Sequence, residues 1–392
     1  MDAATPYQLL SPIQEIMLAD SLSDPSAGHH VEQLEITFSE EMEPTRVAAA
    51  WRSTVAACAV LQTCFAISHA SPQGQHVVKD VPEMEILDLN SDLLDSWREA
   101  DRRQPLLAKD CVPWRTAYWP AQRRWCWTFH HALLDGRSIT RILQVFLTYL
   151  AGERSTKLAQ SIWSPPSPES VKVATETLLR IRRKCPEPEW PHDAATTQQP
   201  AIRRMGHAFA ESLKTRATTL GTTAATLVIG GWGHALTGFL NTDSVLVEQL
   251  RAGAPQPQTA GFTMHVLPLM IRRGASHLPE LRADLLAMRR FETVSPDDFA
   301  RGIYPDMAAA PVIMVEHSTL SHALRHHPLL ETAKLRERPA TYSSASAFLR
   351  PDLEMKVEGP HRHDLLARWC DALESLDFGI AETRTTAGRV RR

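Results

Sequence analysis

The sequence contains few cysteines, and none of them forms a close pair. Six cysteines are scattered among 392 residues without a C-x-x-C spacing. Disulfide-dependent secreted domains have a much denser pattern, and many structural zinc sites bring two cysteines close together in the sequence. The pattern therefore predicts reduced, mostly buried thiols and a cytoplasmic protein.

The chain also has no extended apolar stretch. A membrane-spanning helix needs about 18 or more consecutive apolar residues, and the most apolar segment, 224–236, is interrupted by glycines and by His234. The first eleven residues have neither the basic start nor the apolar stretch of a signal peptide. These absences predict no membrane association and no secretion.

Acidic and basic residues nearly balance. The formal net charge is -3 at pH 7, which provides no basic field for nucleic acid or an anionic membrane. Glycine-rich nucleotide loops and the H-E-x-x-H or Cys/His spacings of metal sites are missing as well. We therefore expect no nucleic-acid partner, no metal site and no permanently bound cofactor.

The length of the chain indicates two folded units. A chain of 392 residues exceeds what one hydrophobic core usually supports. Proline-rich segments at 164–168 and 185–191 flank a short amphipathic stretch. Because proline disrupts helices and central strands, we expect a linker wrapped around one helix at 163–200. This linker would separate an N-terminal lobe, 1–162, from a C-terminal lobe, 201–392.

Both halves mix helix and strand patterns, so the predicted fold class is α/β. Ser11 and Gln14 form a capping box, and Pro12 suits the first position of a helix. Residues 34–38 alternate as in a half-buried strand, and residues 124–152 read as strand, tight loop and helix. Further expected helices are 44–61, 222–240 and 364–376, and further expected strands are 244–250, 265–271 and 311–316.

The segment from Phe129 to Gly136 carries the clearest chemical signal. It reads Phe-His-His-Ala-Leu-Leu-Asp-Gly, with two histidines at the end of a predicted strand. Acyl transfer to an amine or alcohol needs a base that removes a proton during the attack, and histidine suits this role. Asp135 would hold the loop through an ion pair or backbone hydrogen bonds. Gly136 would permit a backbone conformation or a close approach that a Cβ forbids.

A structural role is the alternative for the two histidines. Adjacent histidines also occur at 29–30 and 326–327, and His361 and His363 fit a solvated loop. Taken alone, a histidine pair is more often structural than catalytic or metal-binding. Zinc is disfavoured further because no second ligand motif accompanies the pair.

Residues 130–136 resemble the HHxxxDG motif of condensation domains from nonribosomal peptide synthetases, which are chloramphenicol-acetyltransferase-like acyltransferases. The resemblance implies that His131 is catalytic, that His130 is structural and that Asp135 is a structural ion-pair partner. It also implies two similar α/β lobes in a V-shaped pseudo-dimer with a central channel. The donor would be an acyl thioester on the phosphopantetheine arm of a carrier protein, or coenzyme A, and the acceptor an amine or alcohol.

Other segments extend the resemblance over most of the chain. Residues 10–18 resemble the opening helix of the family, and residues 58–65 resemble its second motif. Two further segments, 105–107 and 113–115, fall where the family approaches its catalytic strand. Residues 261–269 resemble the segment around a family N-T-L-P-L.

The second motif departs from the family pattern. Gln62 and Cys64 stand where the family carries arginines, one of which pairs with the aspartate of the HHxxxDG motif. Asp135 must therefore have another partner, and Arg115 and Arg251 are the candidates.

Three other features bear on the expected substrate channel. His265 stands where the family usually has asparagine and would add a titratable group near the cleft. Ser138 would either assist the reaction intermediate or, as we favour, cap the helix that follows. The region 318–350 fits the family pattern poorly and leaves the acceptor side open.

Four functions are compatible with these residues, and carrier-dependent condensation that forms an amide or ester is favoured. An acyltransferase that uses coenzyme A or a polyketide chain would employ the same histidine. Epimerisation would need a glutamate motif that residues 248–251 match only loosely. The fourth function is a catalytically silent module that docks carrier proteins. Gln62, Cys64 and His265 favour it, whereas the intact motif at 130–136 argues against it. No adenylation, carrier or thioesterase segment fits within 392 residues, so we expect a stand-alone unit.

Overall fold

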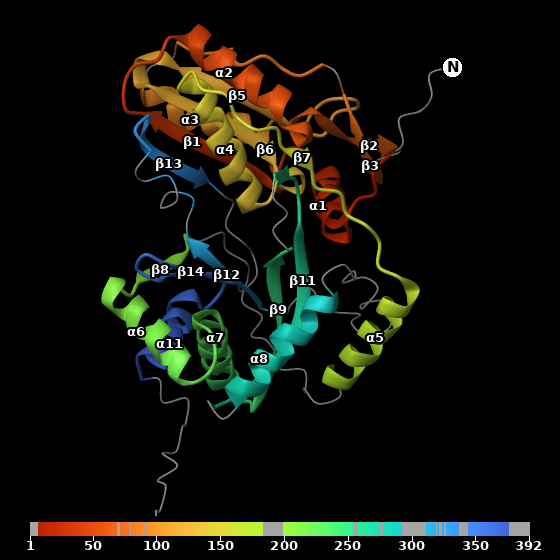
Figure 1. The fold of residues 1–392 in the computed structure, drawn as a ribbon, viewed down its shortest axis with the longest axis vertical. Helices are drawn as coiled ribbons and strands as arrows, with labels where there is room; N and C mark the ends of the chain where they lie inside the picture. The colour runs from red at the N-terminus through yellow and green to blue at the C-terminus, as the bar shows by residue number, and fades with distance from the viewer. Residues whose placement is uncertain are drawn as a thin grey trace, which may run out of the picture.

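The computed structural model describes residues 7–375 except 69–70, 79, 89–90, 183–198, 254–257, 275–276, 292–310, 319, 321–323, 325–326 and 337–343. The described residues form two α/β lobes, each with one mixed central sheet (Figure 1). The predicted fold class is therefore confirmed. The second proline-rich segment, 185–191, and His326 lie outside the described residues.

The sheet of the first lobe has the strand order β13-β1-β6-β5-β4. Its strands are β1 (Val31–Phe38), β4 (Glu85–Ile86), β5 (Trp114–Trp119), β6 (Arg124–His130) and β13 (Leu330–Arg336). Its helices are α1 (Pro12–Ser23), α2 (Pro44–Ala57), α3 (Leu94–Arg103) and α4 (Gly136–Leu150), with short turns η1 (Ala59–Gln62), η2 (Ser91–Leu93), η3 (Pro120–Gln122) and η4 (His131–Leu133). A separate hairpin joins β2 (Thr63–Ser68) to β3 (Ser71–Val77).

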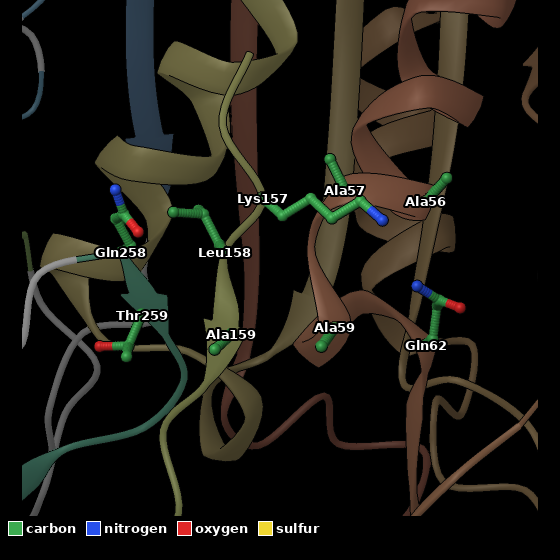
Figure 2. Close-up of a pocket in the computed structure, with 9 residues that line it drawn as sticks. All are labelled: Ala56, Ala57, Ala59, Gln62, Lys157, Leu158, Ala159, Gln258 and Thr259. Atoms are coloured by element: carbon green, nitrogen blue, oxygen red, sulfur yellow. The ribbon is translucent and has the colours of Figure 1, made fainter.

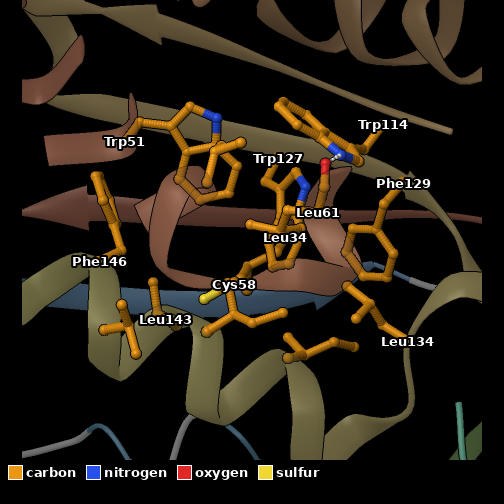
Figure 3. Close-up of a cluster of buried hydrophobic side chains, with 14 of the residues drawn as sticks. Leu34, Trp51, Cys58, Leu61, Trp114, Trp127, Phe129, Leu134, Leu143 and Phe146 are labelled. Carbon is orange, nitrogen blue, oxygen red and sulfur yellow. Dashed lines mark hydrogen bonds between the residues drawn. The ribbon is translucent and has the colours of Figure 1, made fainter. Parts of the chain in front are cut away.

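Large aromatic side chains fill one face of this sheet. Trp127 of β6 lies opposite Leu34 of β1, and both are buried. Trp51 of α2 packs edge-on against Trp127, with ring centroids 5.3 Å apart, and Phe146 of α4 belongs to the same cluster (Figure 3). Buried aromatics contribute strongly to core stability. The core therefore fixes the position of β6 and of the residues that follow it.

The second lobe is built around the glycine-rich helix α7 (Ala224–Leu240). Its sheet has the order β11-β9-β12-β14-β15-β8. The strands are β8 (Ala201–Arg204), β9 (Ser244–Ala252), β11 (Met264–Arg272), β12 (Val312–Ser318), β14 (Ser344–Arg350) and β15 (Glu354–Glu358). The other helices are α6 (His207–Thr219), α8 (Leu278–Ala287), η6 (Met288–Phe291) and α11 (Arg362–Ser375).

The expected helices and strands are present, with boundaries shifted by a few residues. The helix expected at 44–61 ends at Ala57 and continues as the 3-10 turn η1, because Cys58 adopts an extended conformation. The helix expected in the linker is α5 (Pro168–Arg182). No helix among the described residues has the length and apolar character required to cross a membrane.

Two strand pairings join the halves of the chain. Strand β13 comes from the second half but pairs antiparallel with β1 in the first lobe, where it appears in blue in Figure 1. Strand β7 (Ala159–Gln160) also pairs in parallel with β10 (Thr259–Ala260). The expected division at 163–200 therefore does not separate the two sheets completely, because nonlocal strand pairing returns part of the second half to the first lobe.

Glycines allow α7 to pack closely in the second lobe, and we expect Gly233→Ala to destabilise the protein. An added Cβ at Gly233 would lie 2.1 Å from Cγ2 of Ile271, whereas nothing lies within 4 Å of an added Cβ at Gly238. Overpacking should cost about 1 to 3 kcal/mol or more. The control Gly238→Ala, in the same helix, should stabilise by about 0.5 to 1 kcal/mol. Urea unfolding of both variants measures the difference, and equal effects would contradict the packing.

Candidate active site

The connection between β6 and α4 is short and is held from several sides. The backbone N–H of His131 donates to the carbonyl of His30 at 2.7 Å, which extends the pairing of β6 with β1 by one residue. Gln14 in α1 donates its side-chain amide to the Ala132 carbonyl at 2.8 Å. The oxygen of the same amide accepts from the backbone N–H of Ser11, which confirms the expected capping box. Helix α1 therefore supports the turn that carries the two histidines.

His130 is sealed inside the protein, with 1% of its surface exposed. Its Nδ1 accepts from the Ala132 backbone N–H at 3.1 Å, so the proton of a neutral ring must be on Nε2. Nε2 lies 2.9 Å from Ser21 Oγ, and that hydroxyl donates to the His29 carbonyl. Burial lowers the pKa of His130 to about 3. The ring is therefore neutral and inaccessible at neutral pH, as a structural residue should be.

His131 has the opposite environment. Its side chain is 26% exposed, and its Nδ1 lies 3.2 Å from Oε1 of Glu32, whose side chain is 8% exposed. The ring of Phe262 meets the His131 imidazole edge to face, with centroids 5.9 Å apart. Phe262 comes from the second half of the chain, so His131 lies at the junction of the halves. This accessible imidazole beside a buried carboxylate can accept and return a proton.

Glu32 was not anticipated from the sequence. It precedes Leu34 and Ile36 on the face of β1 that otherwise carries apolar side chains, and it lies directly opposite Phe129 of β6. His131 is two residues beyond Phe129, so Glu32 and His131 are diagonal neighbours, close enough for side chains to meet. The available signal in the sequence was the position of Glu32, an acidic residue on the strand face where apolar side chains are expected.

Asp135 is held by neutral donors from both halves of the chain. One carboxylate oxygen accepts from the Ser138 backbone N–H at 2.8 Å, and this bond caps α4. The other accepts from the Thr263 backbone N–H at 3.1 Å and from the Thr263 hydroxyl. The expected partner Arg115 is wrong. Strand alternation places Arg115 opposite Thr128, and its guanidinium pairs with Asp101 of α3.

Ser138 is buried and contacts backbone rather than solvent. Its hydroxyl donates to the Gly261 carbonyl at 2.8 Å and accepts from the Gly261 N–H at 3.0 Å. The helix cap expected at Ser138 is therefore wrong, because Asp135 occupies that position. Ser138 instead holds the β10 segment against α4. Its donor capacity is already used by a carbonyl, which leaves no hydroxyl proton for a reaction intermediate.

Arg251 and His265 form a cross-strand pair in β9 and β11. Arg251 donates to the Leu285 carbonyl at 2.9 Å. Burial and, to a smaller extent, the Arg251 charge lower the pKa of His265 to about 4, while Asp135 opposes the shift. His265 thus lies in the electrostatic range of the motif, as expected, but stays neutral at neutral pH.

Gly136 is the first residue of α4 and its expected role is wrong. Its backbone φ is not positive, and an added Cβ would lie 3.6 Å from Oε1 of Glu316, which is ordinary contact. The constraint expected at Gly136 occurs instead at Gly261. There an added Cβ would lie 3.1 to 3.3 Å from Ser161, because β7 and β10 pair closely.

The residues that replace the family arginines have local partners. Gln62 donates to the Val55 carbonyl at 2.9 Å. Cys64 lies opposite His76 across the β2–β3 hairpin.

A pocket at the junction contains Gln62, Lys157 and Thr259 among its lining residues (Figure 2). His131 is not among those residues, and the pocket borders the β7–β10 pairing. The pocket is therefore a feature of the junction and not the reaction site.

Comparisons with known proteins find condensation domains and nonribosomal peptide synthetases. Residues 5–163 match the family model described as Condensation domain. A linear gramicidin synthase protein of Brevibacillus parabrevis is 26% identical over 279 residues, covering 63% of this chain and 5% of that protein. Nonribosomal peptide synthetase 30 of Fusarium vanettenii is 24% identical over 288 residues, covering 67% of this chain and 5% of that protein. The chain therefore spans 5% of the length of these relatives.

Solved structures match nearly the whole chain. The first condensation domain of the calcium-dependent antibiotic synthetase, in complex with substrate analogue 3a, gives a TM-score of 0.70 at 16% identity over 95% of each chain. A variant of the starter condensation domain of rhizomide synthetase, in complex with C8-CoA, gives 0.72 at 16% identity over 94% of each chain.

The two-lobed architecture is that of the chloramphenicol-acetyltransferase-like fold. Residues 5–163 therefore match a condensation-domain model, and the chain has the fold of solved condensation domains over 95% of its length.

The buried, neutral ring of His130 predicts that the folded protein becomes less stable as the pH falls. Burial lowers the pKa of His130 from 6.5 to about 3 in the folded protein. Between these values the unfolded chain binds a proton that the folded protein excludes, so stability falls as pH decreases from 6.5 towards 3. The loss should approach about 1.4 kcal/mol per pH unit for this group. Urea unfolding between about pH 7 and pH 4 should show a shallower slope for His130→Asn, and equal slopes would contradict this assignment.

Proposed function

We propose that the domain transfers an acyl or aminoacyl group from a carrier-bound thioester to an amine or hydroxyl acceptor, with His131 as the base. One observation carries the proposal: His131 alone of the two motif histidines is accessible, and it lies against the Glu32 carboxylate and the Phe262 ring. His130 is buried and neutral, and its ring accepts a hydrogen bond from the backbone of the turn at Ala132. Asp135 and Ser138 hold the turn to the second half of the chain.

The proton moves between the acceptor, His131 and the departing thiol. The Glu32 carboxylate favours the tautomer with a proton on Nδ1 of His131, so that Nε2 is the proton acceptor. The acceptor nitrogen or oxygen attacks the thioester carbonyl, a C–N or C–O bond forms, and the acceptor proton moves to Nε2. The C–S bond then breaks, and the imidazolium returns the proton to the departing thiolate. Glu32 stabilises the positive charge that exists between these events.

The likeness to condensation domains supports a proposal for the donor and the partners. We propose an acyl- or peptidyl-carrier protein with its phosphopantetheine thioester as donor. A coenzyme A thioester is the alternative donor, supported by the C8-CoA complex of the rhizomide synthetase domain. The phosphopantetheine arm is a substrate carrier and not a resident cofactor. The buried free thiols of Cys58, Cys126 and Cys370 favour a reducing compartment such as the cytoplasm.

Epimerisation is the second candidate, and one observation favours it. Burial raises the pKa of Glu248 in β9 to about 7, so this carboxyl can exchange a proton at neutral pH. Epimerisation would leave the thioester intact and invert the α-carbon, whereas condensation consumes the thioester. Chiral analysis of the carrier-bound aminoacyl group separates the two.

The first test follows acyl-loaded carrier protein by intact mass with a panel of amines and alcohols. Wild type should release the carrier thiol and form an amide or ester, and His131→Ala should react at least about 100-fold more slowly, because a general base contributes that much. His207→Ala, an exposed histidine on α6, is the matched control and should retain full activity. Equal turnover by wild type and His131→Ala would remove His131 from the mechanism. Carrier binding without turnover by either would support a silent docking module.

Glu32 should act as a positioning residue. We expect Glu32→Gln to lower kcat about 10- to 100-fold with little change in KM, because the amide cannot stabilise the imidazolium. The acidic limb of the pH–rate profile should move to lower pH, since a neighbouring negative charge favours the protonated ring. Glu32→Asp should recover part of the rate. A wild-type pH profile in Glu32→Gln would leave Glu32 with a structural role alone.

A further inference from the structure

Three potential metal ligands meet at the edge of the β2–β3 hairpin. Cys64 and His76 are directly opposed in the antiparallel register. Cys64 Sγ lies 3.2 Å from His76 Nε2, and Asp110 Oδ1 lies 3.3 Å from the same nitrogen. One ligand atom from each of the three residues lies within 4.8 Å of the others. The hairpin backbone thus brings the thiol and the imidazole together, and the loop before β5 adds the carboxylate.

Without a cation, hydrogen bonds link all three groups in one imidazole tautomer only. A neutral imidazole Nε2 either donates or accepts. If Nε2–H donates to Asp110, the Cys64 thiol can donate only to Nδ1, which lies 3.5 Å away. If the thiol donates to Nε2, Asp110 faces a nitrogen lone pair.

A single divalent cation would bind all three groups directly. Zinc binds thiolate at about 2.3 Å and imidazole or carboxylate at about 2.0 to 2.2 Å in a tetrahedron. Those bond lengths give edges of about 3.6 Å between sulfur and nitrogen and about 3.3 Å between nitrogen and oxygen. The observed 3.2 Å and 3.3 Å separations lie close to these edges. The mixed sulfur, nitrogen and oxygen donor set favours zinc over magnesium or calcium.

We propose that Cys64, His76 and Asp110 bind one Zn²⁺ ion. The exposed Asp110 leaves the site open to metal entry. We expected no metal site from the sequence because residues 64, 76 and 110 match no short ligand motif.

The site would also support the active-site turn. The Asp110 loop leads to Pro113, whose carbonyl accepts from the His130 backbone N–H at 3.0 Å. A metal joining this loop to the hairpin would restrict Pro113, which closely follows Asp110, and with it the end of β6. The role is structural, and it does not depend on the proposed acyl transfer.

The experiment is a zinc titration of the reduced, chelator-stripped full chain, with metal content measured by elemental analysis and stability by thermal unfolding. We expect one equivalent of zinc per chain, a zinc-dependent rise in Tm, and a thiolate-to-metal charge-transfer band when Co²⁺ replaces zinc. Asp110→Ala changes an exposed residue and should fold, yet bind zinc at least about 10-fold more weakly. Cys64→Ser should abolish the charge-transfer band.

His207→Asn is the matched control and should bind zinc like wild type. Failure of the wild type to retain zinc at micromolar concentration would overturn the proposal. Unchanged zinc affinity in both Asp110→Ala and His76→Asn would place the metal elsewhere and overturn it equally. A Cys64–Cys111 disulfide in the freshly purified protein, detected by mass spectrometry without reductant, would assign the cluster to thiol oxidation instead.

Discussion

The Asp135 carboxylate connects the active-site turn to the second half of the chain. It accepts from the Ser138 N–H at the start of α4 and from the N–H and hydroxyl of Thr263. A buried carboxylate without donors would be costly, and three hydrogen bonds offset that cost. The N-cap residue of α4 is therefore held in part by the second half of the chain. If Thr263 moved away, the Asp135 carboxylate would lose two of its three hydrogen-bond donors. The position of the histidine turn depends on the same contacts.

Adjacent histidines have different properties because a strand ends between them. His130 is the last residue of β6 and points into the first lobe, where Ser21 and the Ala132 N–H fix its tautomer. His131 begins the turn, remains accessible, and meets Glu32 from β1 and Phe262 from the second half. A single step along the backbone thus separates a neutral structural ring from one that is available for proton transfer. The aromatic core beneath β6 keeps both positions fixed.

The halves of the chain are connected by backbone as well as by side chains. Strand β13 completes the first sheet, and the β7–β10 pair places Gly261 against Ser161. Arg137 and Arg141 of α4 donate to the carbonyls of Gly253 and Thr259. These contacts surround the segment that carries Thr263 and Phe262. The side chains around His131 are thereby drawn from distant parts of the chain.

Local patterns in the sequence predicted the helices and strands, the two-lobed α/β class and the identity of the histidine motif. Amphipathic spacing, the Ser11 capping box and proline breaks are local properties, and the structure follows them closely. The motif also indicated His131, whose catalytic role stays a prediction. The hydrogen-bond and ion-pair partners of the motif residues could not be predicted from local sequence in the same way. Arg115 and Asp135 are both in the first lobe, yet strand alternation directs Arg115 to Asp101.

The tertiary structure determines which side chains contact the motif residues. Thr263 is a partner of Asp135 where the resemblance predicted an arginine, and Glu32 reaches His131 through strand register. The Cys64, His76 and Asp110 cluster likewise exists only because a hairpin and a loop meet. Strand order and register depend on the packing of the whole core, which no short stretch of sequence encodes. Local sequence thus specified the elements and indicated His131, while folding established the electrostatic environment of that histidine.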